Sequence, residues 1–258
     1  MNAPPFASRN SMMVQRIGGS ARAVGLFALI AIATAALSSC VSAPRFDEAE
    51  IASAVLVEER SRHLFLTTPT QARATGLIFY PGGLVAPGAY VPLLDDVAAA
   101  GYPVVIPRMP FGLAVFAPLR GVELQSEYPG VARWVIAGHS LGGAMAARAV
   151  FREPNEFDGL ILVAAYPANS DDLSDRDLPV VSIYADRDGL ALPEEIEASE
   201  DLLPADTVFM EIAGGNHAQF GSYGPQDGDN QAAIPRDTQQ RVTARAILEL
   251  LSSFSPTP

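Results

Sequence analysis

Short apolar segments alternate with longer amphipathic segments along the chain from residue 53 onward. The segments that predict strands are 53–57, 63–68, 76–80, 104–106, 134–137, 160–165, 180–184 and 208–212. The segments that predict helices are 90–100, 122–128, 141–151, 194–203 and 238–252. Strands that alternate with helices form a mostly parallel sheet with helices on both faces. The sequence therefore predicts an α/β fold, which binds ligands at the carboxyl ends of its strands.

Residues 53–258 have the size and composition of one domain. α/β folds commonly reach about 200–250 residues without splitting into two domains. Apolar residues make up 49% of the chain and charged residues 18%, which supplies a buried core and is unlike a disordered chain. The formal net charge of −12 argues against a nucleic-acid partner, because such proteins need a basic face that displaces counterions.

The first 39 residues have the three-part layout of an export signal. This stretch contains no acidic residue. It begins with a segment that carries Arg9, Arg16 and Arg22, continues with an apolar run over 23–37 and ends in small residues. A membrane-spanning helix needs about 20 apolar residues, and this run is shorter. The pattern therefore predicts a signal peptide over 1–39, with a permanent transmembrane anchor as the alternative.

The apolar run ends in Leu37-Ser38-Ser39-Cys40, which resembles the lipobox of bacterial lipoproteins. The resemblance implies that Cys40 is acylated and that 40–52 forms the lipidated cysteine and its tether. An exported domain would then be held on a membrane of the cell envelope, since each buried methylene contributes about 0.8 kcal/mol. The alternative is an unmodified thiol in an ordinary signal peptide. Cys40 is the only cysteine, so no disulfide can form within the chain.

The residues Gly138-His139-Ser140-Leu141-Gly142 match the pattern G-x-S-x-G between a predicted strand and a predicted helix, the context that this motif requires. Glycine is needed on both sides because the turn is sharp and crowded. Such a turn presents Ser140 at the tip of the sheet, where the start of the following helix favours negative charge. The pattern predicts Ser140 as a nucleophile. The alternative is a small-residue helix start that packs on the sheet.

The predicted strand, this turn and the following helix resemble the fifth strand and nucleophile turn of the α/β-hydrolase family. The resemblance extends over most of the chain after about Ser53. The runs 80–83, 138–144 and 214–220 resemble small, poorly characterised, esterase-like members. The family implies an α/β-hydrolase fold and a fixed chain order of nucleophile, acid and then histidine.

After the strand predicted at 180–184, the run 185–189 resembles the acid-bearing loop of the family. The spacing implies Asp188 as the acid that orients the histidine. Asp186 is the alternative, because Ala185 stands where the family often has glycine, which leaves the register open.

The run 213–220 follows the last predicted strand and contains His217, the expected base. His139 adjoins the nucleophile, where the resemblance implies a side chain that points away from the reaction. His63 precedes the nucleophile in a predicted strand. A histidine without a catalytic role is the alternative for His217.

An oxyanion is stabilised by two backbone N–H donors about 3 Å from the developing charge. One is expected from Leu141, directly after the nucleophile. The other is expected from the loop that follows the strand at 76–80, where Pro81-Gly82-Gly83-Leu84 replaces the common His-Gly of the family. Both Gly83 and Leu84 are candidates for this second donor.

Serine, acid and histidine in this order imply acyl transfer to water through an acyl-enzyme, with neither cofactor nor metal. We expect a carboxylester hydrolase that acts on a small-molecule ester with a small or medium acyl group. The short polar connection 167–178 predicts a small or absent lid, although 109–118 or 221–237 can cover the site instead. Alternatives are an acyltransferase, lipase or peptidase with the same residues, or a non-catalytic binding module.

Overall fold

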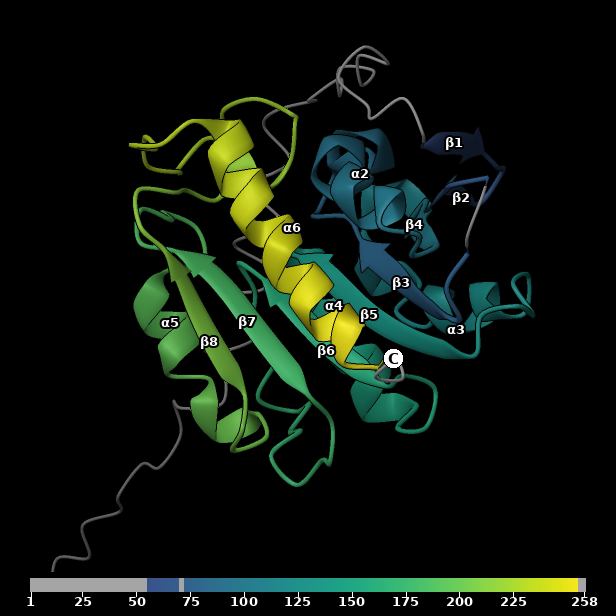
Figure 1. Cartoon of the computed structure of the whole chain (residues 1–258). Coiled ribbons are helices and arrows are strands. Elements are labelled where there is room, and N and C mark those ends of the chain that lie inside the picture. The colour runs from purple at the N-terminus through teal and green to yellow at the C-terminus, as the bar shows by residue number, and fades with distance from the viewer. Residues whose placement is uncertain (1–54, 70–71, 255–258) are drawn as a thin grey trace, which may run out of the picture.

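The computed structural model describes residues 55–69 and 72–254. Its strands form one eight-stranded sheet in the order β1-β2-β4-β3-β5-β6-β7-β8 (Figure 1). The strands are β1 (Leu56–Glu59), β2 (His63–Thr67), β3 (Thr75–Tyr80), β4 (Val104–Pro107), β5 (Arg133–His139), β6 (Gly159–Val163), β7 (Val180–Ala185) and β8 (Val208–Ile212). The pairs β1–β2 and β2–β4 are antiparallel, and all other neighbours are parallel. The predicted mostly parallel sheet is thereby confirmed.

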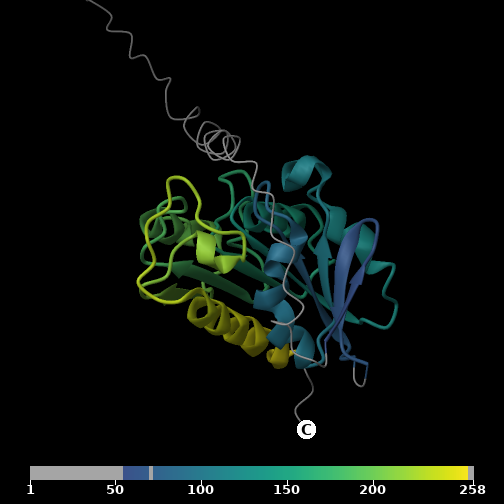
Figure 2. The ribbon, with the colours of Figure 1, turned by 90° about the horizontal axis from the view of Figure 1, so that it is seen from above.

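Helices cover both faces of this sheet. The α-helices are α2 (Val91–Ala99), α3 (Arg120–Gln125), α4 (Leu141–Arg152), α5 (Pro193–Glu197) and α6 (Arg236–Ser253). The short 3₁₀ turns are η3 (Pro87–Tyr90), η4 (Pro110–Gly112), η5 (Ala114–Phe116), η6 (Glu200–Leu202) and η7 (Ala218–Phe220). Figure 2 shows α2 and α6 together on one face and α4 on the other.

Two buried clusters of apolar side chains hold the helices to the sheet. Alternate residues of a strand point to opposite faces. In β3, Leu77 and Phe79 accordingly join α2 and α6, whereas Ile78 and Tyr80 join α3 and α4. All six residues of β3 are buried, as expected for a central parallel strand covered on both sides.

Element boundaries differ from the predictions at a few positions. The helix predicted over 194–203 is confirmed only in its first part: α5 ends at Glu197, and η6 follows as a separate 3₁₀ turn. The Ser199 hydroxyl donates to the Ile196 carbonyl at 2.7 Å, a local bond that competes with the helical backbone pattern. The strand predicted to reach Ala165 ends at Val163, because Ala164 adopts φ 46°. The helix predicted over 122–128 begins at Arg120 and ends at Gln125.

The first strand begins at Leu56, later than predicted, although residues 53 and 54 lie outside the described part. The predicted signal peptide, Cys40 and the tether also lie outside it. Among residues 55–69 and 72–254, no helix is long and apolar enough to span a bilayer.

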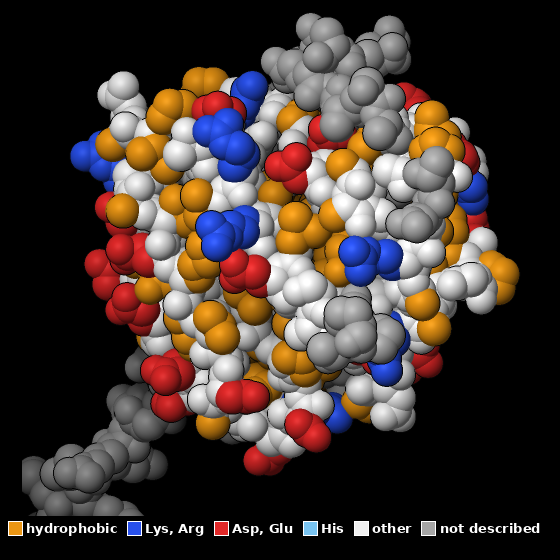
Figure 3. Space-filling model, viewed as in Figure 1, with side chains coloured by type: hydrophobic (Ala, Val, Ile, Leu, Met, Phe, Trp, Pro, Cys, Tyr) orange, Lys and Arg blue, Asp and Glu red, His pale blue; other side chains and the backbone are white. Residues whose placement is uncertain are grey.

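The connection between β6 and β7 carries neither helix nor strand, so no lid domain is inserted there. Asp171 in this connection is buried and accepts a hydrogen bond from Arg148 of α4 at 2.9 Å. Acidic side chains gather at the left edge of Figure 3, on the side where α5 and β8 lie. They include the exposed residues Glu194, Glu195, Glu197, Glu200 and Asp201.

Candidate active site

Ser140 stands at a strained turn between β5 and α4. Its backbone has φ 54° and ψ −126°, a conformation that non-glycine residues rarely adopt. The strand continues through His139, two residues beyond its predicted end, and the helix begins at Leu141. Ser140 is only partly buried, so its side chain is presented at the carboxyl end of a central strand.

The glycines around Ser140 are there because the backbones touch. A Cβ on Gly142 would lie 2.3 Å from the carbonyl oxygen of Tyr80, and one on Gly138 would lie 2.4 Å from the backbone of Gly142. These neighbours are backbone atoms and cannot rotate away. The G-x-S-x-G pattern therefore reflects the close approach of α4 to β3 and β5 at this corner.

Asp188 and His217 form a buried pair. The distance from His217 Nδ1 to Asp188 Oδ2 is 2.7 Å, and the two side chains are 1% and 0% exposed. The other oxygen, Oδ1, accepts the backbone N–H groups of Leu190 and Ala191, each at 2.8 Å. Because the carboxylate accepts, Nδ1 donates the proton and Nε2 of His217 is left as an acceptor. This is the arrangement that a general base requires.

Asp186, the alternative acid, has another partner. Its Oδ1 accepts the backbone N–H of Gly214 at 2.6 Å, which closes the turn that leads into the His217 loop. The structure thus pairs Asp188, and not Asp186, with the imidazole.

The loop that carries His217 is held by polar side chains that belong to none of the sequence motifs. Asp229 accepts the N–H groups of Gly189 at 3.1 Å, His217 at 3.3 Å and Ala218 at 2.9 Å. Gln239 of α6 accepts from the Asn216 N–H at 3.0 Å and donates to the Asn216 carbonyl at 2.7 Å. The sequence gives one indication for Gln239, because it occupies a core-facing position of the predicted amphipathic helix. It gives no indication for Asp229, which lies in an irregular loop.

The candidate oxyanion donors differ in availability. The Leu84 N–H donates to the Gly112 carbonyl at 2.8 Å, which removes Leu84 as a donor. The Gly82 N–H donates to the Tyr90 hydroxyl at 2.9 Å. Among the described residues, the N–H groups of Gly83 and Leu141 have no such partner, and both residues line one cavity.

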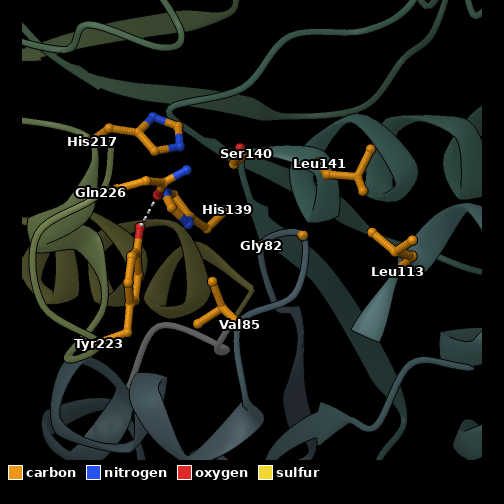
Figure 4. Close-up of a pocket in the computed structure, with 10 residues that line it drawn as sticks. Gly82, Val85, Leu113, His139, Ser140, Leu141, His217, Tyr223 and Gln226 are labelled. Carbon is orange, nitrogen blue, oxygen red and sulfur yellow. Dashed lines mark hydrogen bonds between the residues drawn. The ribbon is translucent and has the colours of Figure 1, made fainter. Parts of the chain in front are cut away.

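This cavity contains Ser140 and His217. It has an empty volume of about 350 Å³ that opens to solvent, and Figure 4 shows the side chains around it. Its lining residues are Gly82, Gly83, Val85, Leu113, His139, Ser140, Leu141, His217, Tyr223 and Gln226. Tyr223 and Gln226, from the loop 221–235, form one wall of the cavity, and Leu113, from the segment 109–118, forms another. The Tyr223 hydroxyl donates to the Gln226 side chain at 3.1 Å.

His139 does not point away from this site, contrary to the prediction. Its ring lies 4.5 Å from the His217 ring between centroids and lines the cavity. Burial, and then the neighbouring charge of His217, lower the pKa of His139 well below its usual value. Because the chain turns sharply at Ser140, the preceding strand residue lies against the ring of the base. His63 lies elsewhere and bonds Tyr128.

In residues 55–69 and 72–254, no three His, Cys, Asp or Glu side chains gather as metal ligands would. Asp188 and His217 are committed to each other and to backbone donors. The site brings together a serine, a histidine paired with a carboxylate, and two backbone N–H groups.

Solved structures share this fold at low sequence identity. A predicted CIB-like hydrolase from Thermoplasma acidophilum has a TM-score of 0.58 and 16% identity, over 76% of this chain and 99% of that chain. MGS-MChE2, an alpha/beta hydrolase enzyme from a sediment metagenome of the Mar Chica lagoon, Morocco, has a TM-score of 0.56 and 16% identity, over 77% of this chain and 98% of that chain. Mouse alpha/beta hydrolase domain-containing protein 10 has a TM-score of 0.52 and 13% identity, over 79% of this chain and 100% of that chain.

A search of the curated proteins finds no match. The sequence model of the Alpha/beta hydrolase family, however, matches residues 76–241, which is more than half of the chain and includes Ser140, Asp188 and His217. This match agrees with the sheet order, the strained serine turn and the buried acid–histidine pair. The chain belongs to the alpha/beta hydrolase family.

Proposed function

We propose that this hydrolase cleaves carboxylic esters with a small or medium acyl group through an acyl-enzyme on Ser140. The observation that carries the proposal is the cavity that contains Ser140 and His217, with His217 bonded to buried Asp188 at 2.7 Å. Ser140 is the only Ser, Thr or Cys among the residues that line this cavity, and family membership supports a hydrolase.

The reaction follows from the positions of these groups. His217 Nε2 takes the proton of Ser140 as its Oγ attacks the ester carbonyl carbon. The oxyanion accepts hydrogen bonds from the Leu141 and Gly83 N–H groups. The tetrahedral intermediate expels the alcohol, which receives the proton from His217, and leaves the acyl group on Ser140. Water, deprotonated by His217, then attacks the acyl-enzyme; the second tetrahedral intermediate releases the carboxylic acid, and His217 returns the proton to Ser140 Oγ. Asp188 stabilises the imidazolium at each stage.

The walls of the cavity favour a short acyl chain. Val85, Leu113 and Leu141 provide apolar contacts, whereas Tyr223 and Gln226 limit the cavity on the side of the base. Apolar contact from only three side chains suits a short acyl group better than a long one.

Turnover of a p-nitrophenyl ester series from acetate to laurate tests this function. We expect wild type to prefer the short esters, and Ser140→Ala to lower kcat by at least about 10³-fold. Ser252→Ala is the matched control, because Ser252 is exposed and its hydroxyl only donates to the Glu249 carbonyl within α6. A folded wild type without turnover, or Ser140→Ala at the level of Ser252→Ala, contradicts the proposal.

We also propose that the exported chain is acylated on Cys40 and anchored to a membrane through that lipid. The support is the sequence Leu37-Ser38-Ser39-Cys40 after an apolar run. The tether over 40–52 would then connect the lipid to the catalytic domain.

A further inference from the structure

Tyr90 lies at the end of η3, immediately before α2, and is fully buried. Its ring packs 5.0 Å from the Phe79 ring between centroids. The hydroxyl is the part that this apolar packing does not explain, since a phenylalanine would fill the same space. A buried hydroxyl is retained without loss of stability only where it is hydrogen-bonded.

The Tyr90 hydroxyl joins two polar groups in one chain. It accepts the Gly82 N–H at 2.9 Å and lies 2.9 Å from His139 Nδ1. Burial raises the pKa of Tyr90, so the hydroxyl keeps its proton. Because the Gly82 N–H can only donate, that proton is directed to His139 Nδ1. The chain therefore runs from Gly82 through Tyr90 to His139.

These hydrogen bonds link the loop after β3 to the end of β5, two segments that meet at the active site. Gly82 belongs to the loop after β3, and His139 is the last residue of β5, directly before Ser140. The approach is close, because a Cβ on Gly82 would lie 2.9 Å from the Tyr90 hydroxyl and 3.0 Å from His139 Nδ1. Turning the Gly82 amide toward Tyr90 leaves the next amide, that of Gly83, without a partner among the described residues, beside the cavity.

His139, the last member of this hydrogen-bond chain, contacts the base His217. The His139 ring lies against the His217 ring, and burial lowers the pKa of His139, so it is neutral near pH 7. A neutral ring at this place supports His217 without placing a second positive charge beside the imidazolium that forms during the reaction. The hydroxyl of Tyr90 fixes which nitrogen of His139 accepts.

We propose that the Tyr90 hydroxyl is a positioning group for the oxyanion loop: it holds the Gly82 amide against His139 and thereby directs the Gly83 N–H toward the developing oxyanion. This inference rests on the proposed function, because the oxyanion exists only if Ser140 attacks an acyl group. Tyr90 itself does not touch the substrate.

Tyr90→Phe tests the inference, with Tyr102→Phe as the matched control. Tyr102 is also buried, but its hydroxyl has no hydrogen-bond partner in the described part of the chain. For Tyr90→Phe we expect kcat to fall on the order of 10- to 100-fold, with KM within about twofold of wild type. Tyr102→Phe should retain wild-type kcat and KM.

A tetrahedral analogue separates positioning from a general loss of structure. A trifluoromethyl ketone forms an oxyanion on Ser140, whereas the unfluorinated methyl ketone of the same shape binds largely as an intact ketone. In Tyr90→Phe, we expect the inhibition constant of the trifluoromethyl ketone to rise by the same factor as kcat falls. The inhibition constant of the methyl ketone should stay unchanged.

A second pair of variants tests the chain from its other end, including the case in which Tyr90→Phe does not fold. Asparagine at 139 keeps an acceptor near the position of Nδ1, and alanine does not. His139→Asn should therefore retain about tenfold more kcat than His139→Ala.

Wild-type turnover separates this inference from the proposed function. If wild type turns over esters and Tyr90→Phe matches Tyr102→Phe, the positioning role is overturned and the hydrolase stands. Equal losses in His139→Asn and His139→Ala overturn it as well. If wild type forms no covalent adduct and hydrolyses no ester, both proposals fail together.

Discussion

Asp188 and Asp186 lie two residues apart in one loop and have different partners. Asp188 meets His217 at 2.7 Å, whereas Asp186 accepts the Gly214 N–H at 2.6 Å. A sequence pattern cannot separate two carboxylates this close, because the difference lies in which residues from other loops reach them. The loop geometry assigns the bond to the imidazole to one of them and the closure of a turn to the other.

Asp188→Asn should lower kcat by about 10³- to 10⁴-fold, because the amide no longer holds the His217 tautomer that accepts from Ser140. Asp186→Asn keeps an oxygen acceptor for Gly214 and should retain kcat within about threefold. Steady-state kinetics on a short p-nitrophenyl ester measures both. The reverse ranking would assign the acid to Asp186.

The buried neutral histidine predicts a dependence of stability on pH. Burial lowers the pKa of His139 well below 6.5 in the folded state, while in the unfolded chain it titrates near 6.5. As the pH falls below 6.5, the unfolded state binds a proton that the folded state does not. The contribution of neutral His139 to the free energy of unfolding is therefore fully present above pH 6.5. Below pH 6.5 it falls by about 1.4 kcal/mol per pH unit.

Urea unfolding at pH 7.5, 6.5 and 5.5 measures this loss. His139→Asn has no imidazole to titrate at this position, so its free energy of unfolding should fall less steeply than that of wild type over the lower interval. Parallel curves for the two proteins would show that His139 is not held neutral.

At the scale of elements, the corner between β3, β5 and α4 depends on glycine. The backbone of α4 at Gly142 lies so close to the backbone at the end of β3 that no side chain fits. At Gly130, by contrast, a Cβ would meet nothing within 4 Å. These two glycines therefore provide a matched comparison of the same change.

Gly142→Ala should destabilise the protein by on the order of 3 kcal/mol, because the backbone atoms that it meets can move only with their elements. Gly130→Ala should change the free energy of unfolding by less than about 0.5 kcal/mol. Thermal or urea unfolding gives both values. A Gly142→Ala protein as stable as Gly130→Ala would contradict the close backbone packing between α4 and β3.

The predicted strands and helices were correct in kind and order because hydrophobic periodicity is a local property. Local pattern did not predict the break between α5 and η6, where a single serine hydroxyl competes with the helix. Nor did it predict the position of His139, which depends on how sharply the chain turns at Ser140. Asp229 reaches Gly189 across 40 residues, a contact that no sequence window contains.

The hydrolase-fold domain carries the candidate active site, whereas the proposed lipid anchor belongs to the N-terminal 54 residues. The sheet places Ser140, Asp188 and His217 at the carboxyl ends of β5 and β7 and after β8, as an open parallel sheet requires. The proposed lipid on Cys40 would decide where that site is held, without entering the chemistry.

Cys40→Ser tests the anchor. The full chain expressed in a bacterium that processes lipoproteins should incorporate labelled fatty acid and partition into the detergent phase of Triton X-114. Cys40→Ser should lose both properties, while a domain that starts near residue 43 keeps ester turnover. Wild type without the label, or label retained in Cys40→Ser, would contradict acylation at this residue.

Covalent labelling by a fluorophosphonate, followed by peptide mass spectrometry, tests directly whether Ser140 is an activated nucleophile. The reagent modifies a serine only where a base and an oxyanion site activate it. We predict a single adduct on Ser140 in wild type, and none in Ser140→Ala or after heat denaturation. A folded wild type that remains unlabelled, or an adduct on another serine, would contradict Ser140 as the activated nucleophile.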